Sequence, residues 1–190
     1  MRVDLKGPAG RLEAVLDAPP GQPKAAGVFA HPLPTEGGTM HTKAVFQGTK
    51  GLYRIGCAVL RFNFRGVGKS EGAFDKGRGE RDDFRAALDF MAARYPGVPL
   101  WAAGFSFGSN VALEVGAGDD RVTALIGIAP PVAREGYEFP NTLASTKPKF
   151  FVQGSEDELC TIEAMWAFYG TLPEPKELVV IDGADHLFTG

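Results

Sequence analysis

Residues 100–108 read Leu-Trp-Ala-Ala-Gly-Phe-Ser-Phe-Gly, in which an apolar run leads directly into a Gly-x-Ser-x-Gly turn. Residues 107–115, which follow, have a helix-like composition. A serine at the tip of such a turn has a strained backbone, and the residues two positions away on either side must lack a Cβ. Gly104 and Gly108 meet this need. The stretch predicts a strand, a turn that presents Ser106, and a helix; the alternative is a glycine turn in which Ser106 only caps the helix.

Short apolar runs alternate with helical patterns along the whole chain. This alternation predicts an α/β fold, with a mostly parallel central sheet and helices on both faces. We expect strands at residues 12–16, 25–30, 58–64, 100–103, 123–129, 150–153 and 177–181. We expect helices at residues 80–95 and from near residues 42, 107 and 161. Residues 130–148 have no clear period, and we expect a functional loop there.

Composition limits the class of protein. The 190 residues, 44% hydrophobic and 23% charged, suit a single globular domain over residues 1–190. With a net charge of −3 and no basic cluster, no nucleic acid partner is expected. No apolar run reaches the roughly 18 residues of a membrane span and no signal peptide begins the chain, so we expect a cytoplasmic protein with no membrane partner. Cys57 and Cys160 lack metal-ligand spacing, so we expect plain thiols and no metal.

A serine nucleophile needs a base and a group that orients the base. Of the three histidines, only His186 follows Ser106 in the chain, four residues after the last expected strand. Because catalytic groups collect at the carboxyl edge of an open α/β sheet, His186 is the candidate base.

The candidate acid lies in Gly154-Ser-Glu-Asp-Glu158, after another expected strand. We choose Asp157, three residues beyond the turn glycine, and expect Glu156 and Glu158 to be solvated. Asp182, at the end of the last strand, is the second candidate. Asp185 is too close to His186 in sequence to orient it easily.

Two backbone donors are needed for the oxyanion of a tetrahedral intermediate. Phe107, directly after Ser106, supplies one N–H. The loop that begins at His31 reads His-Pro-Leu-Pro, and because proline has no N–H, Leu33 supplies the other. The alternative is an exposed proline-rich loop without a catalytic role.

These motifs, together with Gly37-Gly38 and the run Arg61-Phe-Asn-Phe-Arg-Gly-Val-Gly-Lys-Ser-Glu-Gly72, resemble the α/β-hydrolase superfamily. Within it, the chain is similar to small bacterial hydrolases without a cap domain, related to dienelactone hydrolases and carboxylesterases. The resemblance implies a triad of Ser106, Asp157 and His186 and an oxyanion hole at Leu33 and Phe107. Such folds carry a helix after the catalytic histidine, and here four residues follow His186. We expect either a final helix outside the numbered chain or a histidine loop near a frayed end.

One motif resembles a phosphate-binding loop, which would indicate a different class of protein. Gly66-Val-Gly-Lys-Ser70 looks like the end of a phosphate-binding loop, but the leading glycine is replaced by Asn63 and no convincing helix follows. We therefore expect no nucleotide binding. Arg61 and Arg65 are expected to fix loops around the site or to pair with Asp75, Glu80 or Asp82.

The function expected from these residues is hydrolysis of small, short-acyl carboxylic esters through an acyl-enzyme, without a cofactor. Tyr137, Phe139 and Leu143 are expected to form one wall of a shallow substrate pocket; alternatively these side chains only seal the sheet edge. The competing function is a non-catalytic scaffold that senses a ligand or binds a partner. Neither the natural ester nor the oligomeric state follows from the sequence.

Overall fold

The computed structural model describes residues 1–189. The strands are β1 (Arg2–Gly7), β2 (Gly10–Asp17), β3 (Ala26–Ala30), β4 (Ala58–Phe62), β5 (Leu100–Phe105), β6 (Val122–Ile128), β7 (Lys149–Gly154) and β8 (Lys176–Ile181). The helices are α1 (Lys43–Arg54), α2 (Arg78–Arg94), α3 (Phe107–Gly118), α4 (Pro140–Ala144) and α5 (Ile162–Thr171), with a 3₁₀ turn at Pro34–Glu36. Every strand and helix expected from the sequence is present.

The strands form one eight-stranded sheet in the order β1-β2-β4-β3-β5-β6-β7-β8. From β4 to β8 all neighbours are parallel, while β2 pairs antiparallel with both β1 and β4. The mostly parallel α/β sheet is therefore confirmed. Because parallel strands end at the same edge, the segments after β3, β5, β7 and β8 lie along one side of the molecule.

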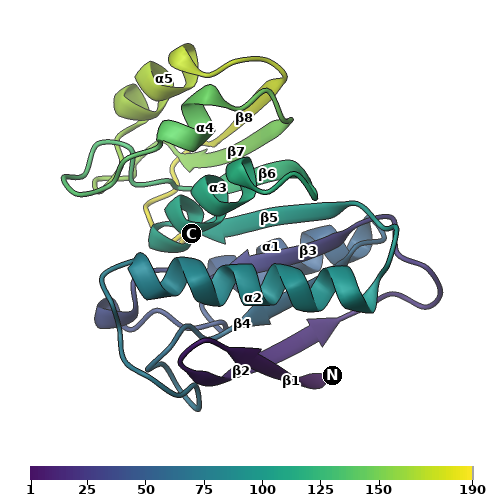
Figure 1. The fold of residues 1–190 in the computed structure, drawn as a ribbon. Coiled ribbons are helices and arrows are strands. Elements are labelled where there is room, and N and C mark those ends of the chain that lie inside the picture. The colour runs from purple at the N-terminus through teal and green to yellow at the C-terminus, as the bar shows by residue number, and fades with distance from the viewer. Residues whose placement is uncertain (190) are drawn as a thin grey trace.

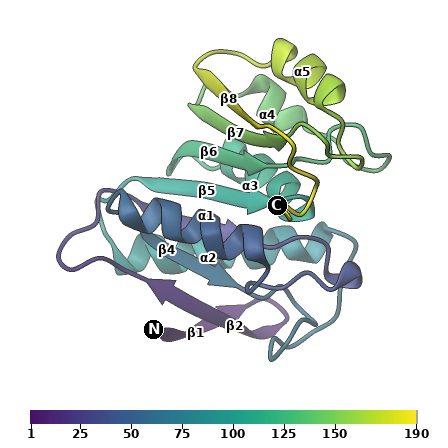
Figure 2. The same cartoon turned by 180° about the vertical axis from the view of Figure 1, so that it is seen from behind.

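Helices cover both faces of the sheet, as the alternation predicted. Helices α2 and α3 lie in front of the sheet in Figure 1, and α1 lies on the opposite face, which Figure 2 shows from behind. Helices α4 and α5 lie on the same face as α2 and α3: the backbone N–H groups of Asn141 and Thr142 in α4 donate to Glu114 of α3, and Met165 of α5 belongs to the same apolar cluster as the buried side chains of α2 and α3. None of the helices in residues 1–189 combines the length and hydropathy that a membrane span needs.

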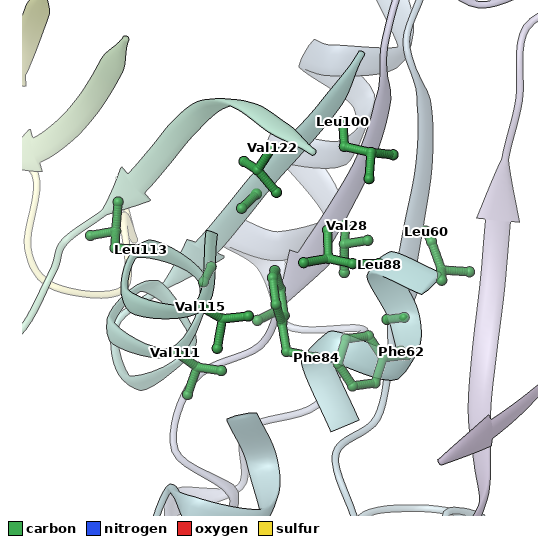
Figure 3. Close-up of a cluster of buried hydrophobic side chains, with 14 of the residues drawn as sticks. Val28, Leu60, Phe62, Phe84, Leu88, Leu100, Val111, Leu113, Val115 and Val122 are labelled. Carbon is green, nitrogen blue, oxygen red and sulfur yellow. The ribbon is translucent and has the colours of Figure 1, made fainter. Parts of the chain in front are cut away.

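The larger core lies between the sheet and helices α2 and α3. Phe84 and Leu88, four residues apart on one face of α2, are fully buried near Val28, Leu60 and Phe62 of the strands (Figure 3). Burial of each such side chain contributes roughly 1.5–3 kcal/mol. This core fixes β5 and α3 rigidly, and the turn at Ser106 joins these two elements.

Strand β1, helix α4 and the 3₁₀ turn at Pro34–Glu36 were not predicted. Strand β1 pairs with β2 around a two-residue turn, with Gly7 opposite Gly10. Only Leu5 of β1 is buried, so the strand gives a weak hydrophobic signal. Within residues 130–148, the short helix α4 begins at Pro140, which fits a first helical position because no N–H is required there.

Candidate active site

The turn at Ser106 has the strained backbone that the sequence predicts. Ser106 has φ 52° and ψ −122°, a conformation that costs a non-glycine residue roughly 1–3 kcal/mol. A Cβ at Gly104 would lie 2.1 Å from the Gly108 carbonyl oxygen, and a Cβ at Gly108 would lie 2.4 Å from the His31 carbonyl oxygen. Both neighbours are backbone atoms. Only glycine therefore allows the turn to close at these two positions.

Three side chains from three different segments form a hydrogen-bonded chain at this turn. Ser106 Oγ lies 3.0 Å from His186 Nε2, and His186 Nδ1 lies 2.8 Å from Asp157 Oδ2. An ionised carboxylate only accepts hydrogen bonds, so Nδ1 carries the proton and donates to Asp157. Nε2 is then free to accept the Ser106 hydroxyl proton. The Phe105 ring packs beside the imidazole, with the ring centroids 5.3 Å apart.

Asp157 is buried and held by donors on both of its oxygens. Oδ1 accepts the backbone N–H groups of Leu159 and Cys160, at 2.9 and 2.8 Å, and Oδ2 accepts from His186 and from Gln153 Nε2, at 2.8 and 2.9 Å. Burial by itself would raise the pKa of this carboxyl. The hydrogen bonds from His186, Cys160 and Gln153 outweigh burial and hold the pKa below its usual value. Asp157 is therefore ionised at neutral pH.

The acid turn and the histidine loop are joined directly. The N–H groups of Ser155 and Glu156 donate to the carbonyls of Ile181 and Ala184, at 3.0 and 2.9 Å. A Cβ at Gly154 would lie 2.3 Å from the Ala184 carbonyl oxygen, so the turn glycine allows this close approach. The approach brings Asp157 within hydrogen-bond distance of His186.

The other candidate acids lie elsewhere. Asp182 is exposed, and its Oδ1 lies 3.4 Å from Ser155 Oγ. Asp185 accepts the backbone N–H groups of Leu187 and Thr189 in its own loop. Neither carboxylate has a hydrogen bond to His186.

The two expected oxyanion donors flank Ser106. Phe107 is the first residue of α3, so its N–H has no acceptor within the helix. Within residues 1–189, the N–H of Leu33 donates to no protein acceptor, whereas its carbonyl accepts from Glu36 and Gly38. The Phe107 side chain faces away from the cavity and packs against Phe64, at a ring centroid distance of 5.7 Å.

His31 holds the Leu33 loop and does not belong to the hydrogen-bonded chain. It is fully buried; its Nδ1 lies 2.7 Å from the Pro32 carbonyl and its Nε2 accepts the Phe64 N–H at 3.0 Å. Burial lowers the pKa of His31 to about 4, although the bond to the Pro32 carbonyl opposes this shift. The imidazole is therefore neutral at working pH and serves as a fixed donor and acceptor.

A cavity of about 740 Å³ opens above Ser106 and His186. Its remaining walls come from the loop at 32–38 with Thr42, from Phe105, from Glu156, Glu158 and Leu159, and from Asp185 and Leu187. Four of these wall residues are acidic and none is basic. The apolar part of the wall is supplied by Leu33, Leu159 and Leu187 of three separate loops, together with Pro32 and Phe105.

The expected pocket wall of Tyr137, Phe139 and Leu143 is not part of this cavity. Phe139 is buried against Phe168, with ring centroids 5.0 Å apart, and Tyr137 packs on Phe107 at 6.4 Å. Leu143 is 40% exposed on α4. The correction has a packing cause: Glu114 of α3 accepts from the backbone N–H groups at the start of α4, and this attaches α4 and its aromatic neighbours to the helical layer.

Residues 66–70, which resemble the end of a phosphate-binding loop, form an ordinary turn. Ser70 donates to the Asn63 carbonyl at 2.7 Å, and no helix begins until Arg78. Arg61 and Arg65 pair with Asp17 and Asp83, at 3.2 and 2.7 Å, so the expected partners Asp75, Glu80 and Asp82 were wrong.

The two cysteines, Cys57 and Cys160, are free and buried. Burial raises the pKa of the Cys160 thiol to about 11. Among residues 1–189 no three His, Cys, Asp or Glu side chains lie together as a metal site.

Two residues of the site were not found from the sequence. Gln153 is a polar residue that follows the apolar run at residues 150–152, directly before the turn glycine, and that position was the available signal. His31 was noted only as the start of its loop. A histidine between a fully apolar strand and a proline was the corresponding signal there.

Comparison with known proteins defines the class. The sequence model of a family described as serine aminopeptidase, S33, matches residues 21–145, and the chain belongs to this family, within the α/β-hydrolase superfamily. The chain is also 32% identical, over 98% of its length and 82% of the relative's, to the uncharacterized protein RP471 of Rickettsia prowazekii (strain Madrid E).

Solved structures agree with this assignment. An α/β serine hydrolase homologue from Coxiella burnetii is 39% identical with a TM-score of 0.91, covering 99% of this chain and 89% of that one. XC6422 from Xanthomonas campestris, an α/β serine hydrolase without a lid, is 37% identical with a TM-score of 0.90, covering 99% and 86%. The protein is a serine hydrolase.

Proposed function

We propose that this protein is a carboxylesterase that hydrolyses short-acyl esters through an acyl-enzyme intermediate, with Ser106, His186 and Asp157 as its catalytic triad. The observation that carries the proposal is the unbroken chain of hydrogen bonds from Ser106 Oγ through His186 to Asp157. A serine hydroxyl is a weak nucleophile, and this chain supplies the base and its orientation.

The reaction has two steps on these residues. Ser106 Oγ attacks the ester carbonyl while His186 Nε2 takes the hydroxyl proton, and the N–H groups of Leu33 and Phe107 stabilise the oxyanion. His186 returns the proton to the leaving alcohol, and the acyl group remains on Ser106. Water, activated by His186, then attacks the acyl carbonyl and releases the acid. Ionised Asp157 stabilises the imidazolium in both steps.

The open cavity supports the preference for short acyl groups. Each methylene taken out of water contributes about 0.8 kcal/mol, and only where a wall covers it. Leu33, Leu159 and Leu187 line the cavity, but Leu159 and Leu187 are 44% and 53% exposed. They leave a long chain largely in solvent. We expect kcat/KM on p-nitrophenyl esters to be highest for acyl groups of roughly two to four carbons.

The test has two parts. A fluorophosphonate should label Ser106, and Ser106→Ala or His186→Ala should lower kcat roughly 10⁴- to 10⁶-fold without unfolding the protein. Retained esterase activity in pure Ser106→Ala would reject the mechanism, and an unlabelled Ser106 would favour the non-catalytic scaffold. In a series from acetate to palmitate, an optimum at eight carbons or more would reject the short-acyl preference. Faster turnover of an aminoacyl p-nitroanilide would replace the ester with an amide as substrate.

A further inference from the structure

Gln153 contacts the proposed catalytic acid from inside the sheet. It lies near the end of β7, before Gly154, and is fully buried. Its Nε2 lies 2.9 Å from Asp157 Oδ2, 2.7 Å from the Cys160 carbonyl oxygen and 3.5 Å from the Gly154 carbonyl oxygen. The side chain therefore spans the same turn that holds Asp157.

The orientation of this carboxamide follows from its neighbours. Reversing it would place Oε1 against a carboxylate and a carbonyl, which are both acceptors, so Nε2 must face Asp157. Oε1 is then left buried without a hydrogen-bond partner among residues 1–189, as is Thr49 Oγ1. An unpaired buried acceptor lowers stability, whereas the Nε2 bonds to the buried Asp157 and Cys160 acceptors stabilise the turn. The side chain thus holds a donor against Asp157 while leaving one acceptor unpaired.

We propose that Gln153 is a positioning residue that sets the proton affinity of the His186 imidazole through Asp157; its role in hydrolysis rests on the proposed function. Oδ2 of Asp157 accepts from both His186 Nδ1 and Gln153 Nε2. The Gln153 bond restricts rotation of the carboxylate and draws electron density from the oxygen that faces the imidazole. A carboxylate weakened in this way stabilises the imidazolium less. Removing the bond should raise the imidazolium pKa.

Other charged and titratable groups near His186 stay unchanged when Gln153 is replaced. The cavity wall beside the imidazole carries Glu36, Glu156, Glu158 and Asp185. The Cys160 thiol lies behind Asp157, with a pKa raised by burial to about 11. A difference between variants at position 153 therefore reports on the contacts of Gln153 with Asp157 and with the turn that holds it.

The experiment compares two variants by NMR titration of the His186 ring. Gln153→Met removes the donor, whereas Gln153→Glu, fully buried beside a carboxylate, should be held protonated and keep an O–H donor toward Asp157 Oδ2. The imidazolium pKa should rise in Gln153→Met and return toward the wild-type value in Gln153→Glu. In Gln153→Met, kcat should fall on the order of tenfold to a hundredfold with little change in KM, as expected for the loss of one hydrogen bond to a charged group. The acid limb of its pH profile should move upward.

Thr49→Val is the matched control. It removes the other buried unpartnered polar atom, in α1, and should change neither the imidazolium pKa nor kcat. An unshifted imidazolium pKa in folded Gln153→Met would overturn the proposal, as would a Gln153→Glu variant that shifts as much as Gln153→Met. So would a control that shifts as much as Gln153→Met.

A measurement on the wild-type protein keeps the proposal testable if these variants do not fold. The side-chain amide protons of Gln153 should shift as His186 titrates, because both residues share Asp157 Oδ2. Amide protons that do not respond would overturn the proposal. If the pKa series behaves as expected and no ester is hydrolysed, the esterase proposal fails, while the effect of Gln153 on the imidazole stands.

Discussion

Two loops at one edge of the sheet serve Ser106 in different ways. The loop at 31–38 follows β3, and the turn at 154–160 follows β7, on the other side of β5 in the sheet order. The first loop presents a backbone N–H, at Leu33, and its shape depends on His31 and Gly38. The second presents a buried carboxylate with four donors. Changes in the first loop should therefore lower kcat without shifting the limbs of the pH profile. Changes in the second loop should alter both kcat and the pH profile.

The largest effect is expected at the carboxylate. Asp157→Asn should lower kcat roughly 10⁴-fold, because an amide can favour the imidazole tautomer that cannot accept the serine proton. Glu156→Gln and Glu158→Gln remove charges from exposed neighbours and should change kcat little. Steady-state kinetics on p-nitrophenyl acetate give the ranking. If Asp182→Asn lowered kcat by this amount instead, the assignment of Asp157 as the catalytic acid would be wrong, although the reaction class would stand.

The loop at 31–38 is tested by adding a single methyl group at Gly38. A Cβ at Gly38 would lie 2.1 Å from the Pro32 carbonyl oxygen, next to Leu33. Gly38→Ala should therefore displace the Leu33 N–H and lower kcat about 10²- to 10³-fold, the loss expected for one oxyanion donor.

The pH profile separates this loss from an effect on the acid–base pair. In Gly38→Ala the limbs of the profile should keep the wild-type positions. Gly51→Ala is the control, because a Cβ there meets nothing within 4 Å in α1 and should leave kcat unchanged. A shifted acid limb in Gly38→Ala would contradict the division of roles between the two loops.

Local spacing predicted much of the site. Gly104 and Gly108 frame Ser106 at fixed offsets, and Asp157 and His186 each follow a strand, so backbone geometry alone brings them to one edge. The side-chain environment does not follow from spacing. Phe139 and Tyr137 were assigned to the cavity because they lie in an irregular segment, but helix α4 packs on α3 and directs them into the core. Gln153 was not identified from the sequence because its contacts with Asp157 and Cys160 exist only once the turn at 154–160 has formed.

The charge of the cavity wall also escaped sequence reasoning, because it arises where distant loops meet. Glu36 comes from the loop after β3, Glu156 and Glu158 from the turn after β7, and Asp185 from the loop after β8. Each is an ordinary exposed or partly exposed residue in its own segment. Only the folded arrangement places all four around one opening.

The stability of the folded protein should depend on pH through the buried imidazole of His31, in the loop at 31–38. His31 has a pKa of about 4 in the folded protein, against 6.5 for an ordinary histidine. Between these values the unfolded chain binds a proton that the folded protein does not, so stability is full above pH 6.5 and falls as pH decreases toward 4. The loss should total about 3 kcal/mol, at about 1.4 kcal/mol per pH unit.

His31→Gln isolates this contribution. His41 and His186 are present in both proteins, so their titration cancels in the comparison. Urea unfolding from pH 7 to 4.5 should show a steeper decline for the wild type than for the variant, whatever the variant's absolute stability. Parallel declines would mean that His31 is not held neutral by burial.

The smallest expected effect concerns a property that the two loops share, which is negative charge at the cavity mouth. Exposed charges act weakly, at roughly 0.2–1 kcal/mol each, but the acidic residues around this opening act in the same direction on an anionic substrate. The ammonium of Lys43 lies nearby, 2.9 Å from the Phe188 carbonyl oxygen, and reduces the field. We expect kcat/KM for p-nitrophenyl hydrogen succinate to be roughly three- to tenfold below that for p-nitrophenyl butyrate at low salt.

Salt and matched variants decide whether the cavity wall causes this difference. Because the Debye length falls to about 10 Å at 0.1 M salt, the ratio between the two esters should shrink as salt is added. Glu156→Gln combined with Glu158→Gln should reduce the ratio. Glu163→Gln combined with Glu177→Gln changes the net charge equally at two exposed positions outside the cavity wall, and should leave it unchanged. Equal reductions in both double variants would assign the effect to net charge, and the two loops would then share no electrostatic role in substrate selection.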